Sequence, residues 1–254
     1  MNRRRQVNAR REPRLKGRLA YGLHPVEEHL SRAAAEVREV WLAMPLNRGR
    51  DEIARRAAAA GVTVHRVAPE DLRDLCGQDE HQGVVAALRE FRYAELEQIA
   101  GRQPGLLVAV DGVEDPRNLG ALIRGVAAAG AEGIVIPRDR AAQVTPVTEK
   151  ASAGVTAWFP VIRVVNLARA LGELKSEFGF WAVALAQDGE VDLYAADIPR
   201  PTVLVVGGET GIRPLVRQNC DIAVRIPMAP GVESLNVAMA AGVGCFELRR
   251  RLVD

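Results

Sequence analysis

Long hydrophobic runs are missing from this 254-residue sequence. The longest apolar stretch, Phe180 to Ala186, has the length of a strand, whereas a membrane-spanning helix needs about 20 apolar residues. The start of the chain carries Glu12, Pro13 and Lys16 where a secretory signal needs an apolar core. We therefore expect neither membrane insertion nor export.

Cysteine is also scarce, with three residues and no CxxC pair. The spacing of Cys76, Cys220 and Cys245 supports neither a disulfide framework nor a common zinc site. We therefore expect a cytoplasmic protein that binds no metal. Because none of the three stands beside a basic motif that would favour a thiolate, they are expected to be small buried hydrophobic residues.

The composition that is present is that of ordinary globular domains. Hydrophobic residues make up 48% of the chain and charged residues 26%, which excludes a disordered, collagen-like or low-complexity protein. A chain of 254 residues suits one or two domains, and we predict two.

Charge is concentrated at the amino terminus. Residues 1–18 hold eight basic side chains against the single acid Glu12, while the rest of the chain holds 26 bases and 31 acids. We expect a basic tail that is disordered when free. Arginine matches phosphate geometry, so the tail is expected either to contact a nucleic acid or to be a solvated extension.

Residues 19–90 are predicted to form a small α/β domain, because helical and strand patterns alternate there. The expected elements are 26–35, 37–43, 51–60, 62–67, 69–76 and 84–88. Asp51 is the expected N-cap of the second helix, and Gly61 is expected to end it. Residues 91–104 are expected to be a linker, because the pattern breaks and ends in Gln103-Pro104-Gly105.

Residues 105–254 are predicted to form a second α/β domain with a mostly parallel sheet covered on both faces. Strands are expected at 106–111, 133–136, 180–185, 202–206 and 222–226, and helices at 119–129, 167–178, 214–219 and 235–251. Ligands of such sheets bind at the carboxyl ends of the strands. The loops that follow the strands are therefore where we expect the chemistry.

The first polar cluster, DGVEDPRNLG, covers Asp111 to Gly120 at the end of an expected strand, and Arg124 follows it. Aspartate, asparagine, glycine and proline also form ordinary turns, so a turn with Asn118 as a helix cap and Arg124 in solvent is the structural alternative. The cluster contains neither a Walker loop nor a GxGxxG fingerprint.

Two further clusters follow strands in the same way. The segment VGGETGI, with Glu209, contains glycines that permit close approach to a ligand; its alternative is a tight turn before a helix. The segment IPMAPGVESLNV contains Met228 and Ser234, which would otherwise serve as core residue and N-cap. Three such loops at strand ends of one sheet indicate a shared site.

These ordered segments resemble a known family. DPRNLG with Arg124, GGETGI and IPMAPGVESLNVAMAAG resemble the three motifs of the SpoU, or TrmH-like, RNA 2′-O-ribose methyltransferases. Residues 149–154 and 160–171 resemble the bacterial branch that methylates a guanosine ribose in 23S ribosomal RNA. YGLHPVEE at 21–28 and HQGVVA at 81–86 resemble the small RNA-binding domain of that branch. The resemblance extends over residues 20–250.

The resemblance implies an α/β catalytic domain with a deep trefoil knot, an exception to the usual unknotted topology. It also implies S-adenosyl-L-methionine as the cofactor, bound within the knot. The matching positions for cofactor contact are Gly207, Ile226, Leu235 and, beside them, Met228. The family resemblance further implies an RNA partner and a homodimer, to which Val243, Phe246 and Leu248 of the terminal helix are expected to contribute an apolar face.

Five polar residues match the positions that the family uses around the reacting ribose: Asn118, Arg124, Glu209, Ser234 and Asn236. Only Thr210 separates Glu209 from Gly211, one residue fewer than is usual in the family, so Glu209 ranks below Asn118, Arg124 and Asn236. For Arg124 we favour electrostatic stabilisation over general-base catalysis, because a guanidinium resists deprotonation.

Two other functions remain open from the sequence. One is ribose methylation of tRNA, in the same enzyme class. The other is a noncatalytic RNA-binding protein of ribosome assembly, against which the presence of Asn118, Arg124 and Asn236 argues.

Overall fold

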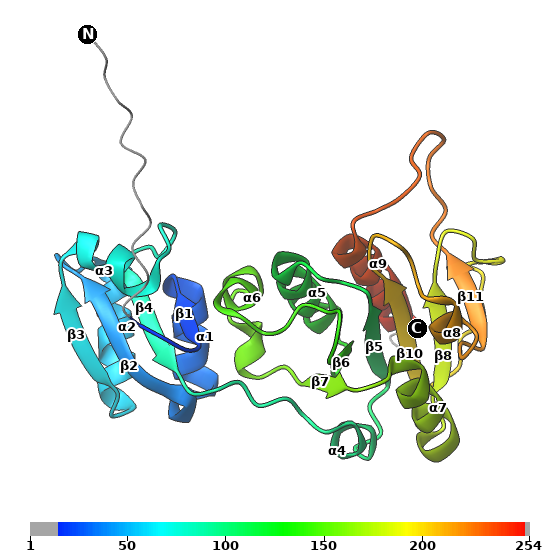
Figure 1. Cartoon of the computed structure of the whole chain (residues 1–254), viewed down its shortest axis with the longest axis horizontal. Helices are drawn as coiled ribbons and strands as arrows, with labels where there is room; N and C mark the ends of the chain where they lie inside the picture. Colours follow the sequence, from blue (N-terminus) through cyan, green and yellow to red (C-terminus); the bar gives the residue numbers. More distant parts are fainter. Residues whose placement is uncertain (1–14, 252–254) are drawn as a thin grey trace, which may run out of the picture. The chain divides into compact units, whose positions relative to one another are not determined.

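The computed structural model describes residues 15–251 and divides into two compact units, residues 1–90 (unit 1) and residues 91–254 (unit 2). Figure 1 shows the elements of each unit. Residues 91–104, expected to be a linker, instead belong to unit 2. Ala94 forms a parallel bridge with Ile162, and Ile99 in helix α4 (Leu96–Ala100) is buried. The turn at Gln103-Pro104-Gly105 therefore lies within a unit and does not separate two of them.

Unit 1 is built on a four-stranded sheet with the order β1-β4-β2-β3. Its elements are β1 (Leu19–Tyr21), α1 (Leu23–Arg32), η1 (Ala34–Glu36), β2 (Val37–Ala43), α2 (Arg48–Ala59), β3 (Thr63–Val67), α3 (Pro69–Cys76) and β4 (Val84–Leu88). Strands β2 and β3 are parallel, whereas β4 is antiparallel to both β1 and β2. This arrangement confirms a small α/β layer.

Alternation along the strands explains why helices cover both faces of this sheet. Val40 and Leu42 of β2 join the hydrophobic cluster of α1 and α2, while Trp41 and Ala43 join that of α3, which includes Leu72. Side chains two residues apart on a strand share a face, so one strand supplies both clusters.

Two expectations for unit 1 were wrong. The N-cap of α2 is Asn47, whose side chain accepts from the Arg50 backbone nitrogen at 3.0 Å, so the helix begins before Asp51. The end of the expected tail belongs to the unit: the Leu15 nitrogen donates to the Leu75 carbonyl at 3.0 Å, and the Arg18 carbonyl accepts from the Leu88 nitrogen at 2.9 Å. The rest of the basic tail, residues 1–14, lies outside the described residues.

Unit 2 is built on a seven-stranded sheet with the order β7-β6-β5-β10-β8-β11-β9. Besides α4, its elements are β5 (Leu106–Asp111), α5 (Pro116–Ala128), β6 (Ile134–Pro137), α6 (Pro146–Ala151), η2 (Val155–Ala157), β7 (Val161–Val164), α7 (Leu167–Phe178), β8 (Trp181–Leu185), β9 (Val191–Asp192), β10 (Thr202–Gly207), α8 (Pro214–Arg217), β11 (Ile222–Arg225) and α9 (Val237–Arg250). All the strand pairings of this sheet are parallel, as predicted.

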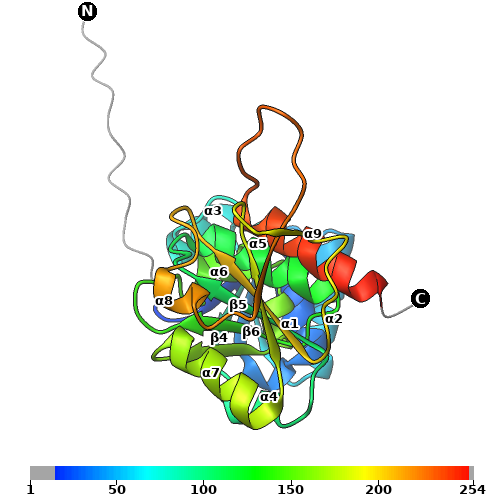
Figure 2. The same ribbon diagram turned by 90° about the vertical axis from the view of Figure 1, so that its right-hand side faces the viewer.

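Helices cover both faces of this sheet (Figure 2). Leu122 of α5 and Ala241 of α9 belong to the hydrophobic cluster on one face, and Leu171 of α7 belongs to the cluster on the other. Strands β7 and β9 and helix α6 were missed from the sequence; β9, with two residues, is too short to show a period. Within residues 15–251, no helix is both long and apolar enough to cross a membrane.

The strand order brings the motif loops together at the carboxyl ends of the strands, which we call the carboxyl edge of the sheet; the amino ends form its amino edge. β5 and β10 are neighbours, with Asp111 opposite Gly207 at their carboxyl ends. β6 and β7 lie on one side of this pair, and β8, β11 and β9 lie on the other. An open parallel sheet binds its ligands at such a switch point, because the loops there diverge and leave a crevice.

Candidate active site

A hydrogen bond between Asn118 and Asn236 joins the first and third motifs. Asn118 lies in the first turn of α5, and Asn236 is the N-cap of α9. The Asn236 Oδ1 accepts from the Ala238 nitrogen at 2.9 Å, and the Asn236 Nδ2 donates to the Asn118 Oδ1 at 3.1 Å. Since this orientation occupies the Asn118 oxygen, its Nδ2 is left without a hydrogen-bond partner among residues 15–251.

The capping roles suggested as structural alternatives belong to other residues. Asp115 is the N-cap of α5, where its Oδ1 accepts from the Arg117 nitrogen at 2.7 Å. Asn236 is the N-cap of α9, which begins at Val237, so Ser234 does not cap that helix. Ser234 is exposed and forms no side-chain hydrogen bond with the described residues. Neither Asn118 nor Ser234 is therefore explained by a helix cap.

Arg124 is not brought into the contact between Asn118 and Asn236. It lies six residues after Asn118 on α5, which places it about 120° away around the helix axis. Its side chain is exposed and forms no hydrogen bond or ion pair with the described part of the chain. Within the described part of one chain, the Arg124 guanidinium thus has no polar partner and lies on a different face of α5 from Asn118.

The second-motif loop, residues 208–213, packs its backbone tightly against its surroundings. A Cβ on Gly208 would lie 2.1 Å from the Gly112 oxygen, and a Cβ on Gly207 would lie 2.3 Å from the Gly211 carbonyl carbon. Real Cβ atoms do not approach so closely, so glycine is required at both positions. The backbone of Gly211 and Ile212 covers the Gly207 α-carbon. A ligand at this segment would therefore contact its other main-chain atoms.

Asp111 and Arg213 form a second contact at this edge, and sequence reasoning missed both as functional residues. Asp111 is fully buried. Its carboxylate accepts from the backbone nitrogen and the Nε of Arg213, each at 2.8 Å, and lies 2.6 Å from the Nη2. The hydrogen bond to Asp111 raises the pKa of Arg213. The available signal was an acid that ends an otherwise apolar buried strand, since buried charges are paired.

Glu209 makes no polar side-chain contact with the described residues, and its side chain is exposed. Its neighbours in the loop are held by the bridge between Gly208 and Gly211, in which the Gly211 nitrogen donates to the Gly208 oxygen at 3.0 Å. The compact turn leaves Glu209 without a group that would orient it.

The third-motif loop, residues 226–236, rises as a long excursion between β11 and α9 (Figures 1 and 2). Ile226 packs against the hydrophobic core at its base, and Met228 and Leu235 are half-buried. Val232 is 49% exposed. The Gln187 side chain donates to the Glu233 carbonyl and so ties the loop to the end of β8. Apolar side chains of this loop are thus available for contact with a ligand.

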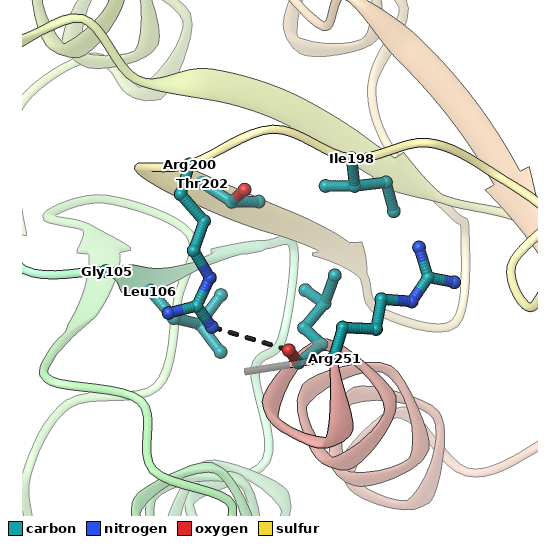
Figure 3. A pocket seen from close by; sticks show the side chains of 7 residues that line it. Gly105, Leu106, Ile198, Arg200, Thr202 and Arg251 are labelled. Atoms are coloured by element: carbon teal, nitrogen blue, oxygen red, sulfur yellow. Dashed lines mark hydrogen bonds between the residues drawn. The ribbon is translucent and has the colours of Figure 1, made fainter. Parts of the chain in front are cut away.

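A cavity of about 110 Å³ lies at the amino edge of the sheet, where β5 and β10 begin (Figure 3). It is lined by Gly105, Leu106, Ile198, Arg200, Thr202, Leu248 and Arg251. Arg200 donates to the carbonyl oxygen of Leu248 at 3.4 Å, and burial lowers the pKa of this arginine. No motif residue lines this cavity, so it is separate from the candidate active site.

Cys76 and Cys245 are buried, as expected from the sequence, whereas Cys220 is only half-buried. Cys245 is fully buried in the core, and burial raises its pKa to about 12. Burial also raises the pKa of Cys220 to about 11 and raises that of Cys76. All three are therefore protonated thiols near neutral pH. Within residues 15–251, no group of three or more histidine, cysteine, aspartate or glutamate side chains could hold a metal ion.

The two units match two family descriptions. Residues 105–246 match the SpoU rRNA Methylase family. Residues 19–94 match the domain described as RNA 2′-O ribose methyltransferase substrate binding. The chain belongs to the SpoU rRNA methylase family.

Similar proteins cover between about three fifths and nine tenths of this chain. The 23S rRNA (guanosine-2′-O-)-methyltransferase RlmB of Ralstonia nicotianae is 41% identical over 93% of this chain and 96% of that protein. The crystal structure of the SpoU methyltransferase AviRb from Streptomyces viridochromogenes, in complex with AdoMet, has a TM-score of 0.77 at 27% identity, over 93% of this chain and 90% of that one. An A. aeolicus TrmH/SpoU tRNA modifying enzyme has a TM-score of 0.53 at 30% identity and covers 61% of this chain and 83% of its own.

Proposed function

We propose that this chain transfers a methyl group from S-adenosyl-L-methionine to the ribose 2′-hydroxyl of a guanosine in 23S ribosomal RNA. The observation that carries this proposal is the bond between Asn118 and Asn236, which joins two family motifs at the switch point of the sheet. The RlmB relative aligns with both units, which supports the same substrate class.

The cofactor is expected between the second-motif and third-motif loops, in contact with Gly207, Ile226, Met228 and Leu235. The tight backbone packing at Gly208 fits a site that takes a ligand through main-chain atoms, and the half-buried Met228 and Leu235 fit contact with a purine ring. When bound, S-adenosyl-L-methionine supplies an electrophilic methyl group on a sulfonium centre.

The polar residues then align the ribose. The unpartnered Nδ2 of Asn118 is suited to hold the 2′-oxygen without adding charge, and Asn236 fixes the orientation of that amide. Arg124 stabilises the developing alkoxide or an adjacent phosphate. Ser234 and Glu209 are exposed, and we expect them to approach the ribose when the RNA or a second subunit covers the loops.

A homodimer would bring Arg124 close to the ribose, which the arrangement within one chain does not do. Met239 and Phe246 lie seven residues apart on one side of α9 and are 61% and 53% exposed, which is costly for a monomer. Val243 is half-buried between them. Leu248, expected on this face, is instead buried in the core. Light scattering is expected to give twice the 27.5 kDa mass of one chain. A fully active protein that is present only as a 27.5 kDa monomer would contradict the dimer.

The trefoil knot remains part of the proposal. α9 follows β11, which lies near one end of the sheet, yet α9 packs against α5 and β10 at its centre. The chain therefore returns from β11 to the middle of the sheet before its last helix. That path is consistent with the knot implied by the family resemblance.

The extent of the match favours ribosomal RNA over tRNA. The tRNA modifying enzyme from A. aeolicus covers 61% of this chain, whereas the RlmB relative covers 93%. Unit 1, matched as a substrate-binding domain, is expected to hold the RNA, with a further contribution from the basic residues 1–14. A ribosomal substrate also supports a cytoplasmic location.

The test is to map ribose methylation by mass spectrometry in RNA from cells that lack the gene. We expect one guanosine of 23S ribosomal RNA to lose its 2′-O-methyl group and to regain it with the wild-type gene but not with Asn118→Ala. Loss from tRNA would establish the tRNA alternative. Unchanged methylation with defective ribosome assembly would favour a noncatalytic role.

A further inference from the structure

Both ends of the second-motif loop are attached to one residue, Asp111. At the entry to the loop, the Gly208 nitrogen donates to the Asp111 carbonyl oxygen at 2.7 Å. At the exit, the Asp111 carboxylate accepts from the backbone nitrogen and the Nε of Arg213, each at 2.8 Å. One residue at the end of β5 thus closes the loop that follows β10.

Besides these bonds, Ile212 of the loop is partly buried against the hydrophobic cluster that includes Val205 and Val216. Glu209 and Thr210 are exposed, and the hydrogen bond from the Gly211 nitrogen to the Gly208 oxygen stays within the loop. Gly208 packs against the backbone of Gly112, which directly follows Asp111 in the sequence. The polar contacts that position the loop relative to the sheet therefore come from the segment that begins with Asp111, in addition to the apolar packing of Ile212.

We propose that Asp111 is a positioning residue, which holds the second-motif loop in the conformation that binds S-adenosyl-L-methionine. This proposal rests on the function proposed above, in which the loop contacts the cofactor. Asp111 is fully buried, so it acts through Arg213 and Gly208 and not by touching the substrate. Because a free loop must be ordered when the ligand binds, releasing it lowers affinity.

Asp111→Asn tests the side-chain contacts of Asp111 separately from its main-chain contact with Gly208. The substitution keeps the size of the residue and its backbone carbonyl, so the bond from Gly208 is retained. The new amide nitrogen faces N–H donors of Arg213 and accepts none of them. Arg213→Lys is the second variant, because it keeps the charge and the backbone donor and loses the planar fork.

Asp221 provides a matched control at the other edge of the sheet. Its carboxylate also accepts from a backbone nitrogen, that of Ala182 at 2.8 Å, and also pairs with a cation, Lys175, at 2.6 Å. Asp221→Asn therefore removes similar bonds at the amino end of β8, away from the motif loops. A purely structural effect would be shared by the two asparagine variants.

The experiment measures the Kd of the full-length protein for S-adenosyl-L-methionine by calorimetry, together with Tm and the rate of RNA methylation. We expect Asp111→Asn to raise the Kd about 10- to 100-fold, as for the loss of a charged hydrogen bond, and to retain kcat within about threefold at saturating cofactor. Arg213→Lys is expected to raise it about 3- to 10-fold, and Asp221→Asn to leave it unchanged.

A Kd for Asp111→Asn within about twofold of the wild-type value, at a Tm lowered as in Asp221→Asn, would overturn the proposal while leaving the function intact. If Asp111→Asn fails to fold, an unchanged Kd in Arg213→Lys overturns it instead. A wild-type protein that neither binds the cofactor nor methylates RNA would refute the proposed function itself, and the positioning role with it.

Discussion

The two edges of the sheet in unit 2 use their polar groups differently. At the amino edge, Arg251 lines the cavity beside Leu106 and Thr202. It donates to the carbonyl oxygens of Leu193 and Ala196, and its Nε lies 2.9 Å from the Glu247 carboxylate. At the carboxyl edge, Arg124 and Glu209 are exposed and have no polar partner among the described residues.

We infer from this difference that the polar groups at the amino edge stabilise the fold, whereas those at the carboxyl edge serve the function. At the amino edge, the charged groups satisfy main-chain carbonyls that would otherwise lose their hydrogen bonds, so they hold the end of α9. At the carboxyl edge, contacts through Asn118, Asp111 and Gln187 hold the motif loops, whereas Arg124 and Glu209 stay available for a substrate. Substitutions at the two edges should therefore affect different measurements.

Asn118→Ala is expected to have the largest effect. Removing the amide that aligns the 2′-oxygen should reduce methyl transfer at least about 100-fold, while the cofactor Kd and Tm barely change. Asn219→Ala at the amino edge is the control, because this amide donates to the Leu215 carbonyl at 2.8 Å and should affect stability alone. Single-turnover methylation of a ribosomal RNA fragment would measure both, and equal rates for the two variants would remove the distinction between the edges.

Arg124→Ala is expected to reduce methyl transfer by about the same factor, since an oriented charge-stabilising donor is lost. Arg124→Lys separates the two possible roles, because a lysine supplies charge and is deprotonated far more easily than a guanidinium. If Arg124 is an electrostatic stabiliser, the lysine variant keeps partial activity with little new pH dependence between pH 6 and 10. A rate that rises with pH would identify a general base, and a wild-type rate for Arg124→Ala would exclude both roles.

Arg251→Ala tests the amino edge. Loss of its bonds to Leu193, Ala196 and Glu247 should lower the free energy of unfolding by about 1 to 3 kcal/mol without changing the methylation rate of the folded protein. Arg250→Ala is the matched control, because Arg250 also pairs with Glu247 at 2.9 Å but is more exposed, and a smaller loss is expected. Urea titration measures both. A larger effect of Arg250→Ala would show that the carbonyl contacts contribute little.

The smallest expected effect is a pH dependence of stability through Glu247. Hydrogen bonds from Arg250, and then from Arg251, lower the pKa of Glu247. A carboxyl group whose pKa is lower in the folded state stabilises that state above its unfolded pKa of about 4.3, and this contribution is lost as pH falls through the lowered value. Glu247→Gln should therefore be less stable than wild type at pH 7. Urea titrations at pH 7 and at pH 3 should show the difference shrinking, and a constant difference would contradict this origin.

Local sequence signals were sufficient for most of the fold. Helix α3 and strands β2 and β4 have the bounds predicted from the sequence. The signals failed where elements are short, as in β9, or where a turn residue lies inside a unit, as in Gln103-Pro104-Gly105. The two residues of β9 carry no periodicity that could separate a strand from a loop.

For the candidate site, the sequence by itself determined which loops matter. Buried parallel strands that end in glycine and polar residues had to place those residues at one edge, because parallel strands all end on the same side. The family motifs added Asn118 and Asn236 as members of one site, but nothing in them required the two side chains to be bonded to each other.

Only the tertiary structure decided the contacts within that edge. Asn118 and Asn236 are 118 positions apart, and Asp111 and Arg213 are 102 apart. Each pair meets because β10 lies beside β5 and α9 returns to α5, which depends on strand order and helix packing and not on any local period. Composition and spacing describe what a segment can form, whereas the partner of a side chain is set by which distant segment the whole chain places beside it.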